Sequence, residues 1–294
     1  MSSNMQIQLG EDSELTVKDT IVLSGISFYS KKKVKAIIKP AGADTGIVFK
    51  KGDRLIPAIS ESIKFREDSH TTSLQKGVVT IKTIEHLMSA LWGMGVDNAI
   101  IVLDEGAQIP FRDASSKYYT GEIKKVGVKT LKKKRKYLIF KKEVRFIESK
   151  DDDRYAVFKP SSGLCITSTT SFPAPIDTKT VRFTWNPEIY ENDISWARSF
   201  LRAPLDDDGL LWQKLRKKFG LLPEDPIDSP VLTYNRDSFI TKLLKQDEPA
   251  RHKLLDFIGD IALLGVRIKA DVEVYKPGHR FTRKIVRDIT KELK

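Results

Sequence analysis

Residues 249–265 form the strongest predicted helix of the chain, and its two faces constrain the fold more than any other stretch. Apolar side chains occupy one face, at Leu254, Leu255, Phe257, Ile258 and Ile261. His252, Asp256 and Asp260 follow at four-residue intervals, so they share another face. Gly259 would cost about 1 kcal/mol in a helix interior. We therefore expect this helix to pack closely against another part of the chain rather than to lie on a free surface.

Short strands and helices make up the rest of the pattern. β-Branched and apolar runs between glycine, proline and aspartate predict strands at residues 20–23, 34–38, 46–49, 78–81, 99–103, 137–140, 154–158, 164–167 and 268–275. Helical spacing of apolar residues predicts further helices at residues 84–93, 115–126, 187–200 and 278–293. Thr83 is the expected N-cap of the first of these helices, and Gly93 and Gly95 end it. The elements predict an α+β fold.

The elements divide into two similar halves around the basic run KKKRK at residues 132–136. Each half begins with strands and continues with helices, which predicts two domains, 1–131 and 137–294, each a β-sheet layered against helices. No aromatic residue interleaves with the basic run. We therefore expect an exposed connector rather than a nucleic-acid-binding arm.

Composition indicates which partners and which cellular compartment the protein could have. A net charge of +12 is typical either of a well-solvated surface or of a chain that meets an anionic partner, such as a nucleic acid, a membrane or a phosphorylated substrate. The single cysteine, Cys165, excludes an internal disulfide and fits a reducing compartment. Residues 1–17 lack a signal-peptide pattern, and no apolar run approaches the roughly 20 residues of a membrane span. We expect a cytoplasmic protein.

Three residues suggest a metal site. His252 and Asp256 form an H-x-x-x-D pair, which places two metal-ligand types one helical turn apart. His86, in the first turn of the helix after Thr83, completes a set of two histidines and one carboxylate that leaves a coordination position for water. Each segment alone is more typical of an ordinary helix with polar residues. Together, His86, His252 and Asp256 predict a catalytic zinc site.

Glu85 and His279 are candidate proton-transfer groups. Glu85 stands next to a metal ligand and could take a proton from the attacking water. His279 lies on a turn before the last helix. It could equally be an ordinary solvent-exposed residue at the start of that helix. Asp260, one turn beyond Asp256, could hold His279 in its charged form. His70 fits none of these roles, and we expect it to be structural.

Several motifs, in order, resemble those of the UDP-3-O-acyl-N-acetylglucosamine deacetylase (LpxC) family, which are zinc enzymes of lipid A synthesis. The run TIEHLMSAL from Thr83, followed by GVDN from Gly95, is a near-complete match to one signature segment. The run ARSF from Ala197, residues 251–265 and the pair GH at Gly278 resemble later ones. The likeness covers nearly the whole chain.

The resemblance implies an activity and a setting. It implies hydrolysis of the acetamide of UDP-3-O-acyl-N-acetylglucosamine to UDP-3-O-acyl-glucosamine and acetate, with zinc or iron(II) as the metal. It also implies that the active site lies between the two α+β domains. The expected partner is a UDP-linked acylated amino sugar. We further expect a monomer with peripheral contact to the inner-membrane face and no nucleic-acid partner.

The resemblance also implies a role for each candidate residue. The metal ligands would be His86, His252 and Asp256. Glu85 would be the general base, and His279, supported by Asp260, would protonate the leaving amine. Lys253 and the hydroxyl of Ser199 would help to stabilise the oxyanion or to bind substrate.

Some positions depart from the family pattern and keep other hypotheses open. Residues 28–31, 108–116 and 205–244 differ, and Phe172 stands where the family has a histidine. These departures favour a second hypothesis, a divergent zinc deacetylase that acts on another N-acetylated, nucleotide-linked sugar. A third hypothesis, a basic nucleic-acid-binding protein, follows from the net charge of +12. It predicts strongly salt-dependent binding and gives no reason for the histidine and carboxylate set.

Overall fold

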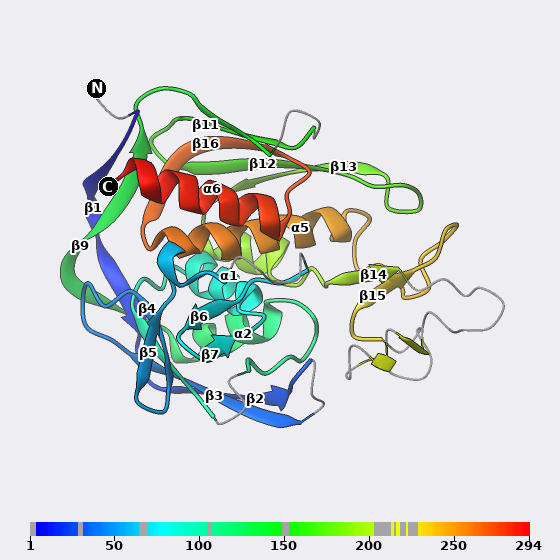
Figure 1. Ribbon diagram of the computed structural model, residues 1–294, viewed down its shortest axis with the longest axis horizontal. Coiled ribbons are helices and arrows are strands. Elements are labelled where there is room, and N and C mark those ends of the chain that lie inside the picture. The colour runs from blue at the N-terminus through cyan, green and yellow to red at the C-terminus, as the bar shows by residue number, and fades with distance from the viewer. Residues whose placement is uncertain are drawn as a thin grey trace.

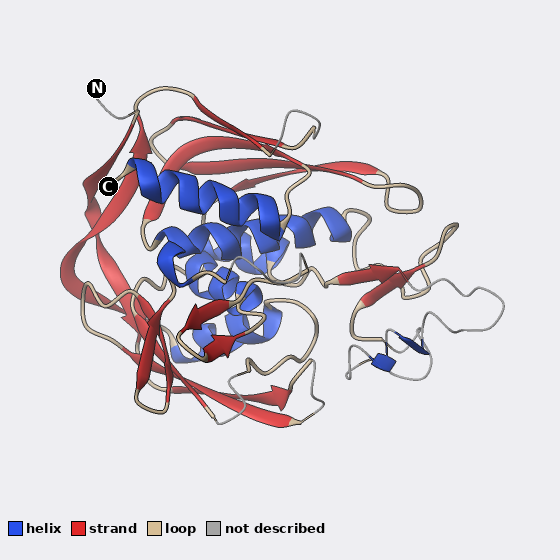
Figure 2. Ribbon diagram, in the orientation of Figure 1, coloured by secondary structure: helices blue, strands red, loops and turns tan. Residues whose placement is uncertain are grey.

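The computed structural model of the chain describes residues 4–28, 32–64, 70–104, 108–148, 153–202, 213–214, 216–217, 222 and 229–294. Two β-sheets enclose a layer of helices, as Figures 1 and 2 show. This arrangement confirms the predicted α+β class. No described helix has the length and apolar character that a membrane span requires.

The first sheet is built from the N-terminal part of the chain. Its order is β2(Ile21–Ile26), β3(Lys33–Pro40), β8(Ala99–Leu103), β4(Ile47–Lys51) and β5(Arg54–Pro57). Its neighbouring strands are antiparallel except β4 and β8, which are parallel. Val34, Ala36 and Ile38 alternate with exposed or partly exposed residues along β3, as expected of a sheet with one covered face. The structure confirms the strands predicted at residues 20–23, 34–38, 46–49 and 99–103; β5 was not predicted.

The second sheet has seven strands and draws on both ends of the chain. Its main order is β1(Met5–Val17), β9(Val128–Phe140), β16(Arg267–Tyr275), β11(Tyr155–Pro160) and β10(Val144–Ile147). β12(Leu164–Ser171) pairs with β16 and with β13(Thr178–Thr184). The strands predicted at residues 137–140, 154–158, 164–167 and 268–275 correspond to β9, β11, β12 and β16. The sequence did not predict β1, β10 or β13.

The basic run at residues 132–136 lies inside β9 and is not an exposed connector. Arg135 is buried, and its guanidinium donates hydrogen bonds to Asp97 and Asp12. The four lysines of the run remain exposed. The prediction is wrong because alternate residues of a strand face opposite sides, so Arg135 points inward to an acidic partner while the lysines next to it point out.

The predicted division into domains 1–131 and 137–294 stays a prediction, as does a site between them. β1 belongs to the first predicted domain, and it pairs with β9, which crosses the predicted boundary. The two halves of the chain therefore share a sheet.

The helices between the two sheets are α1(Glu85–Gly93), α2(Lys117–Val126), α5(Glu248–Ile261) and α6(His279–Glu292). α1 packs against α2 and α5, and α5 packs against α6. The expectation of close packing at Gly259 is confirmed, because a Cβ atom there would lie 2.1 Å from the carbonyl oxygen of Glu85. The first turn of α1 therefore lies directly against α5.

Short elements complete the described fold. A ribbon of β6(Leu74–Lys76) and β7(Val79–Ile81) leads into α1, and β7 corresponds to the strand predicted at residues 78–81. Two 3-10 turns are η1(Ser60–Ser62) and η4(Ala262–Leu264). α1 begins at Glu85, and Thr83 is not its cap. The backbone of Thr83 has a φ of 57°, and its hydroxyl makes no hydrogen bond to a described residue.

The helix predicted at residues 187–200 is much shorter in the structure. It consists of α3(Pro187–Ile189) and the π-helical turn η2(Tyr190–Ile194). The chain then becomes extended in β14(Phe200–Arg202), which pairs with β15(Leu232–Tyr234). Ser199 explains the difference: its N–H donates to the carbonyl of Ala114, and its carbonyl accepts from the N–H of Leu232. These tertiary bonds replace the helical ones that the local pattern predicts.

Candidate metal centre

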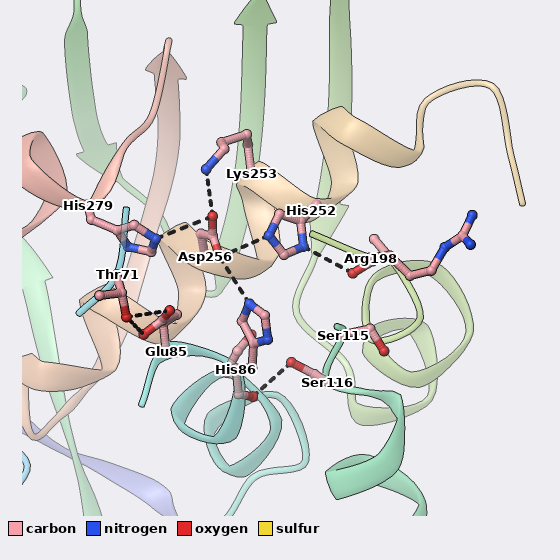
Figure 3. A network of polar contacts seen from close by, with 12 residues as sticks. Thr71, Glu85, His86, Ser115, Ser116, Arg198, His252, Lys253, Asp256 and His279 are labelled. Carbon is pink, nitrogen blue, oxygen red and sulfur yellow. Dashed lines mark hydrogen bonds and ion pairs between the residues drawn. The ribbon is translucent and has the colours of Figure 1, made fainter. Parts of the chain in front are cut away.

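His86, His252 and Asp256 converge at the contact between α1 and α5 (Figure 3). His86 is in the first turn of α1, and His252 and Asp256 are one turn apart on α5. Oδ1 of Asp256 is 3.6 Å from Nε2 of His86 and 3.4 Å from Nε2 of His252. All three side chains are buried. The close approach at Gly259 brings the two helices near enough for these atoms to meet.

This donor set fits a metal ion. Tetrahedral zinc with bonds of about 2.0–2.1 Å holds its ligand atoms roughly 3.3 Å apart, close to the spacing observed. Oδ1 of Asp256 is buried and has no hydrogen-bond donor among the described residues, which is costly for an anionic oxygen unless a cation lies beside it. Burial lowers the pKa of His252 to about 3. The ring is therefore neutral, as a metal ligand must be.

Neighbouring groups orient the ligands on α5. Nδ1 of His252 is 3.1 Å from the carbonyl oxygen of Ala197, which leaves Nε2 to face Asp256. Nζ of Lys253 donates to Oδ2 of Asp256 at 2.7 Å, and Oδ1 is the oxygen that faces His86 and His252. Burial alone would raise the pKa of Asp256, but His252 and Lys253 hold it well below its usual range. Contacts of this kind fix the geometry of metal ligands.

Glu85 lies beside His86, and two threonines hold its carboxylate. Thr71 donates through Oγ1 to Oε1 at 3.0 Å, and the N–H of Thr72 donates to Oε2 at 3.0 Å. Burial raises the pKa of Glu85, although the nearby His279 and His86 oppose this effect. A buried carboxylate with a raised pKa next to a metal ligand can serve as a proton acceptor.

His279, at the start of α6, is paired with Asp260. Its Nδ1 is 2.8 Å from Oδ2 of Asp260, whose other oxygen accepts from Oγ1 of Thr72 at 2.6 Å. Its Nε2 is 3.6 Å from Oδ2 of Asp256. Burial would lower the pKa of His279, but Asp260 and Asp256 raise it to about 9. The ring is therefore charged near neutral pH and can donate a proton.

The metal ligands and both proton-transfer candidates line one cavity of about 740 Å³. Lys253, Ser199 and His70 also line it, although we expected His70 to be structural. Asp260 is not part of the wall and contacts His279 from behind. The aromatic residues of the wall are Phe28, Phe111, Phe172 and Phe200. Among the positions that depart from the family pattern, residues 29–31 and most of 205–228 lie outside the described residues.

Thr71 and Thr72 belong to the site, and the sequence did not predict them. The hydroxyls of both threonines and the amide of Thr72 hold Glu85 and Asp260, and the carbonyl of Thr71 accepts from the buried guanidinium of Arg283 on α6. Two threonines in a loop are common, and two of their partners, Asp260 and Arg283, are far away in the sequence. No local pattern could have found them.

Known proteins resemble this chain over almost its whole length. The family model described as UDP-3-O-acyl N-acetylglycosamine deacetylase matches residues 14–291. The UDP-3-O-acyl-N-acetylglucosamine deacetylase of Citrifermentans bemidjiense is 33% identical over 94% of this chain and 88% of its own length. Proteins of the same name from Syntrophus aciditrophicus and Legionella pneumophila are 31% and 32% identical, over 94% and 93% of this chain and 86% and 88% of theirs. The chain therefore belongs to the UDP-3-O-acyl-N-acetylglucosamine deacetylase family.

Proposed function

We propose that this chain hydrolyses the acetamide of UDP-3-O-acyl-N-acetylglucosamine to give UDP-3-O-acyl-glucosamine and acetate, the committed step of lipid A synthesis. Membership of the family supports this substrate. The observation that carries the proposal is that the metal-ligand set and two proton-transfer candidates, Glu85 and His279, line the same cavity. A metal site, a proton acceptor and a proton donor together suit metal-assisted hydrolysis of an amide.

The proposed metal is zinc, held by His86, His252 and Asp256. Two neutral histidines and one carboxylate, with a position left for water, are typical of catalytic zinc sites. Iron(II) is the other candidate, because imidazole and carboxylate also suit it. When bound, such an ion lowers the pKa of a coordinated water and polarises the amide carbonyl.

Glu85 and His279 are the proposed base and acid. The carboxylate of Glu85 takes a proton from the water whose oxygen attacks the acetamide carbon. As the C–N bond breaks, Nε2 of His279 gives a proton to the amine nitrogen, and acetate leaves. The raised pKa values suit both roles, because Glu85 can keep the proton it accepts and His279 carries one to give. Asp260 is the proposed positioning partner of His279.

Lys253 and Ser199 are proposed to stabilise the oxyanion or to bind substrate. Both line the cavity, and Nζ of Lys253 donates a hydrogen bond to the metal-ligand residue Asp256. An ammonium group and a hydroxyl at this place would lower the energy of negative charge that develops on the carbonyl oxygen.

The residues that line the cavity suit the binding of an acylated nucleotide sugar. The rings of Phe28 and Phe111 lie 4.7 Å apart between centroids, and Leu201 lines the same cavity. This apolar wall could shield an acyl chain from water. Arg154 and Arg280 also line the cavity, and guanidinium groups suit a diphosphate.

A second candidate is a zinc deacetylase that acts on another N-acetylated, nucleotide-linked sugar. Phe172 favours it, because this ring lines the cavity at the position where the family pattern has a histidine. A nucleic-acid-binding role is the distant alternative. It rests only on the net charge of +12 and would require strongly salt-dependent binding.

We also propose that the enzyme is a cytoplasmic monomer that meets the inner-membrane face peripherally. The net charge of +12 supports attraction to an anionic membrane surface. The same charge suits a diphosphate substrate, so no nucleic-acid partner is needed to explain it.

Acetate release from two substrates tests the proposal. The zinc-loaded protein is incubated with UDP-3-O-acyl-N-acetylglucosamine and, separately, with unacylated UDP-N-acetylglucosamine. We expect turnover of the acylated form and much slower turnover of the other. Turnover of the unacylated form alone would favour the second candidate. Turnover of neither by a protein with stoichiometric metal would contradict the primary proposal.

A further inference from the structure

Arg283 lies on α6, and its guanidinium is buried behind the candidate site. The residue is 2% exposed. Its Nε donates to the carbonyl oxygen of His279 at 3.1 Å, and its Nη1 donates to the carbonyl oxygen of Thr71 at 3.0 Å. Both hydrogen bonds are thus made to the backbone, and no carboxylate among the described residues pairs with this cation.

A buried guanidinium without a carboxylate is costly if its only role is to fill space. Moving a cation out of water is unfavourable, and an apolar side chain of similar volume would pack at this place without that cost. A guanidinium, however, carries its donors in a rigid planar fork, so one side chain can join two separate carbonyl groups. The value of Arg283 to the protein therefore lies in the two segments that it joins.

The first segment is the loop that contains Thr71 and Thr72. The hydroxyl of Thr71 and the N–H of Thr72 both donate to the carboxylate of Glu85. The hydroxyl of Thr72 donates to Oδ1 of Asp260 at 2.6 Å. A displacement of this loop would therefore disturb the proposed base and the partner of the proposed acid together.

The second segment is the first turn of α6, where His279 begins the helix. The ring of His279 is paired through Nδ1 with Asp260 at 2.8 Å, and the same nitrogen lies 3.3 Å from the hydroxyl oxygen of Thr72. The backbone carbonyl of His279 accepts from Arg283. Arg283 thus holds the backbone of His279 against the same loop that the ring of His279 contacts.

We propose that Arg283 is a positioning residue for the reaction. By joining the loop at Thr71 to the start of α6, it fixes the distance between the proposed base and the proposed acid. It acts from behind the cavity wall, which it does not line. Base and acid must both reach one bound amide, and a misplacement of about 1 Å can lower a rate by roughly 100-fold. The inference rests on the proposed roles of Glu85 and His279.

Steady-state kinetics of two variants test this inference. Arg283→Met fills a similar volume without a donor, and Arg283→Lys keeps the charge but lacks the fork that spans both carbonyls. The zinc-loaded proteins are assayed with UDP-3-O-acyl-N-acetylglucosamine. We expect kcat of Arg283→Met to fall about 100-fold, with KM and zinc stoichiometry unchanged. Arg283→Lys should show a smaller fall in kcat.

Arg287→Met is the matched control. Arg287 lies one turn further along α6 and pairs with Asp288 of the same helix. The same substitution at this position removes a guanidinium from the same helix, but at a place away from the carbonyl of Thr71. We expect this variant to keep the wild-type kcat.

A merely structural role for Arg283 would give a different pattern. Loss of packing alone would lower the free energy of unfolding and leave kcat of the folded, metal-loaded protein unchanged. Wild-type kcat in both Arg283 variants would therefore overturn the inference, and so would a rise in KM or a loss of zinc at unchanged kcat. If Arg283→Met does not fold, kcat of Arg283→Lys decides between the two roles.

A measurement without turnover separates this inference from the proposed function. In the zinc-loaded wild type, the Nδ1–H of His279 is bonded to Asp260, and its proton NMR signal should exchange slowly with solvent. We expect this slow exchange to be lost in Arg283→Met. Slow exchange that persists in both Arg283 variants would overturn the inference, whatever the activity. A wild type that hydrolyses no acetamide would contradict the proposed function, while loss of slow exchange would still show that Arg283 holds His279 in place.

Discussion

Gly259 lies so close to the backbone of Glu85 that a Cβ atom added to it would meet the carbonyl oxygen of Glu85 at 2.1 Å. Only glycine allows α1 and α5 to approach to this extent. The contact sets Glu85 and His86 on one helix against His252 and Asp256 on the other. The geometry of the site thus depends on a residue that has no side chain.

Gly259→Ala should therefore destabilise the fold and weaken metal binding. Alanine has a better helix propensity by about 1 kcal/mol, but the clash would force the helices apart, and overpacking typically costs about 1–3 kcal/mol. We expect a lower free energy of unfolding in urea for the metal-free protein, and weaker zinc binding. Gly121→Ala is the matched control, because a Cβ atom there meets nothing within 4 Å in α2. It should stabilise by about 0.4–1 kcal/mol. Equal behaviour of the two variants would refute the close-contact account.

Asp97→Asn should destabilise the chain and leave its metal content unchanged. The carboxylate of Asp97 accepts hydrogen bonds from Arg135 and Arg267, which are both buried. Without the carboxylate, the buried Arg267 loses its carboxylate partner and the buried Arg135 keeps only Asp12, at a cost of about 3–5 kcal/mol. Asp44→Asn is the control, because the partners of Asp44 are exposed lysines of β9 and such pairs contribute little. Urea unfolding of both variants checks the prediction, and similar losses would contradict it.

Glu85→Gln should lower kcat by roughly 10²–10⁴-fold while metal stoichiometry is kept. Glutamine has nearly the same shape and can still accept from Thr71, but it cannot take a proton from water. Kinetics together with metal analysis of the same preparation check this prediction. A variant with full metal and wild-type kcat would remove Glu85 from the role of base.

The pH dependence of kcat should report the proton on His279. Burial opposes its charge, but Asp260 and Asp256 raise its pKa to about 9. The protonated ring is the form that can donate, so activity should fall as the pH rises through about 9. Asp260→Asn removes a group that raises this pKa, so the alkaline limb should move to lower pH. An alkaline limb that stays in place in Asp260→Asn would show that another group controls it.

The parts of the site that lie within one local pattern could be predicted from the sequence. Helical spacing places His252 and Asp256 on one face, and the interior Gly259 signals close packing. No local pattern joins these residues to His86, which is far away in the sequence. The link was made because two histidines and one carboxylate form a metal-ligand set, and the order of several motifs then supported it. The ligand set was thus predicted by a combination of helix geometry and family resemblance.

The features of the fold and site that could not be predicted from the sequence depend on contacts between separate segments of the chain. Arg135 looks like one more surface charge in a basic run, because its partners Asp12 and Asp97 come from elsewhere in the chain. Thr71 and Thr72 have no local signal, since their partners lie on three other elements. Tertiary hydrogen bonds of this kind override local propensity, and a single segment does not show them.

Metal content is the most direct test of the account. The purified wild-type chain should contain about one metal ion per molecule. His252→Ala should fold but lose stoichiometric metal, because it removes one of three ligands. His70→Ala, which changes a histidine of the cavity wall outside the ligand set, should keep the metal. Stoichiometric metal in His252→Ala, equal to that in the wild type, would contradict the central claim.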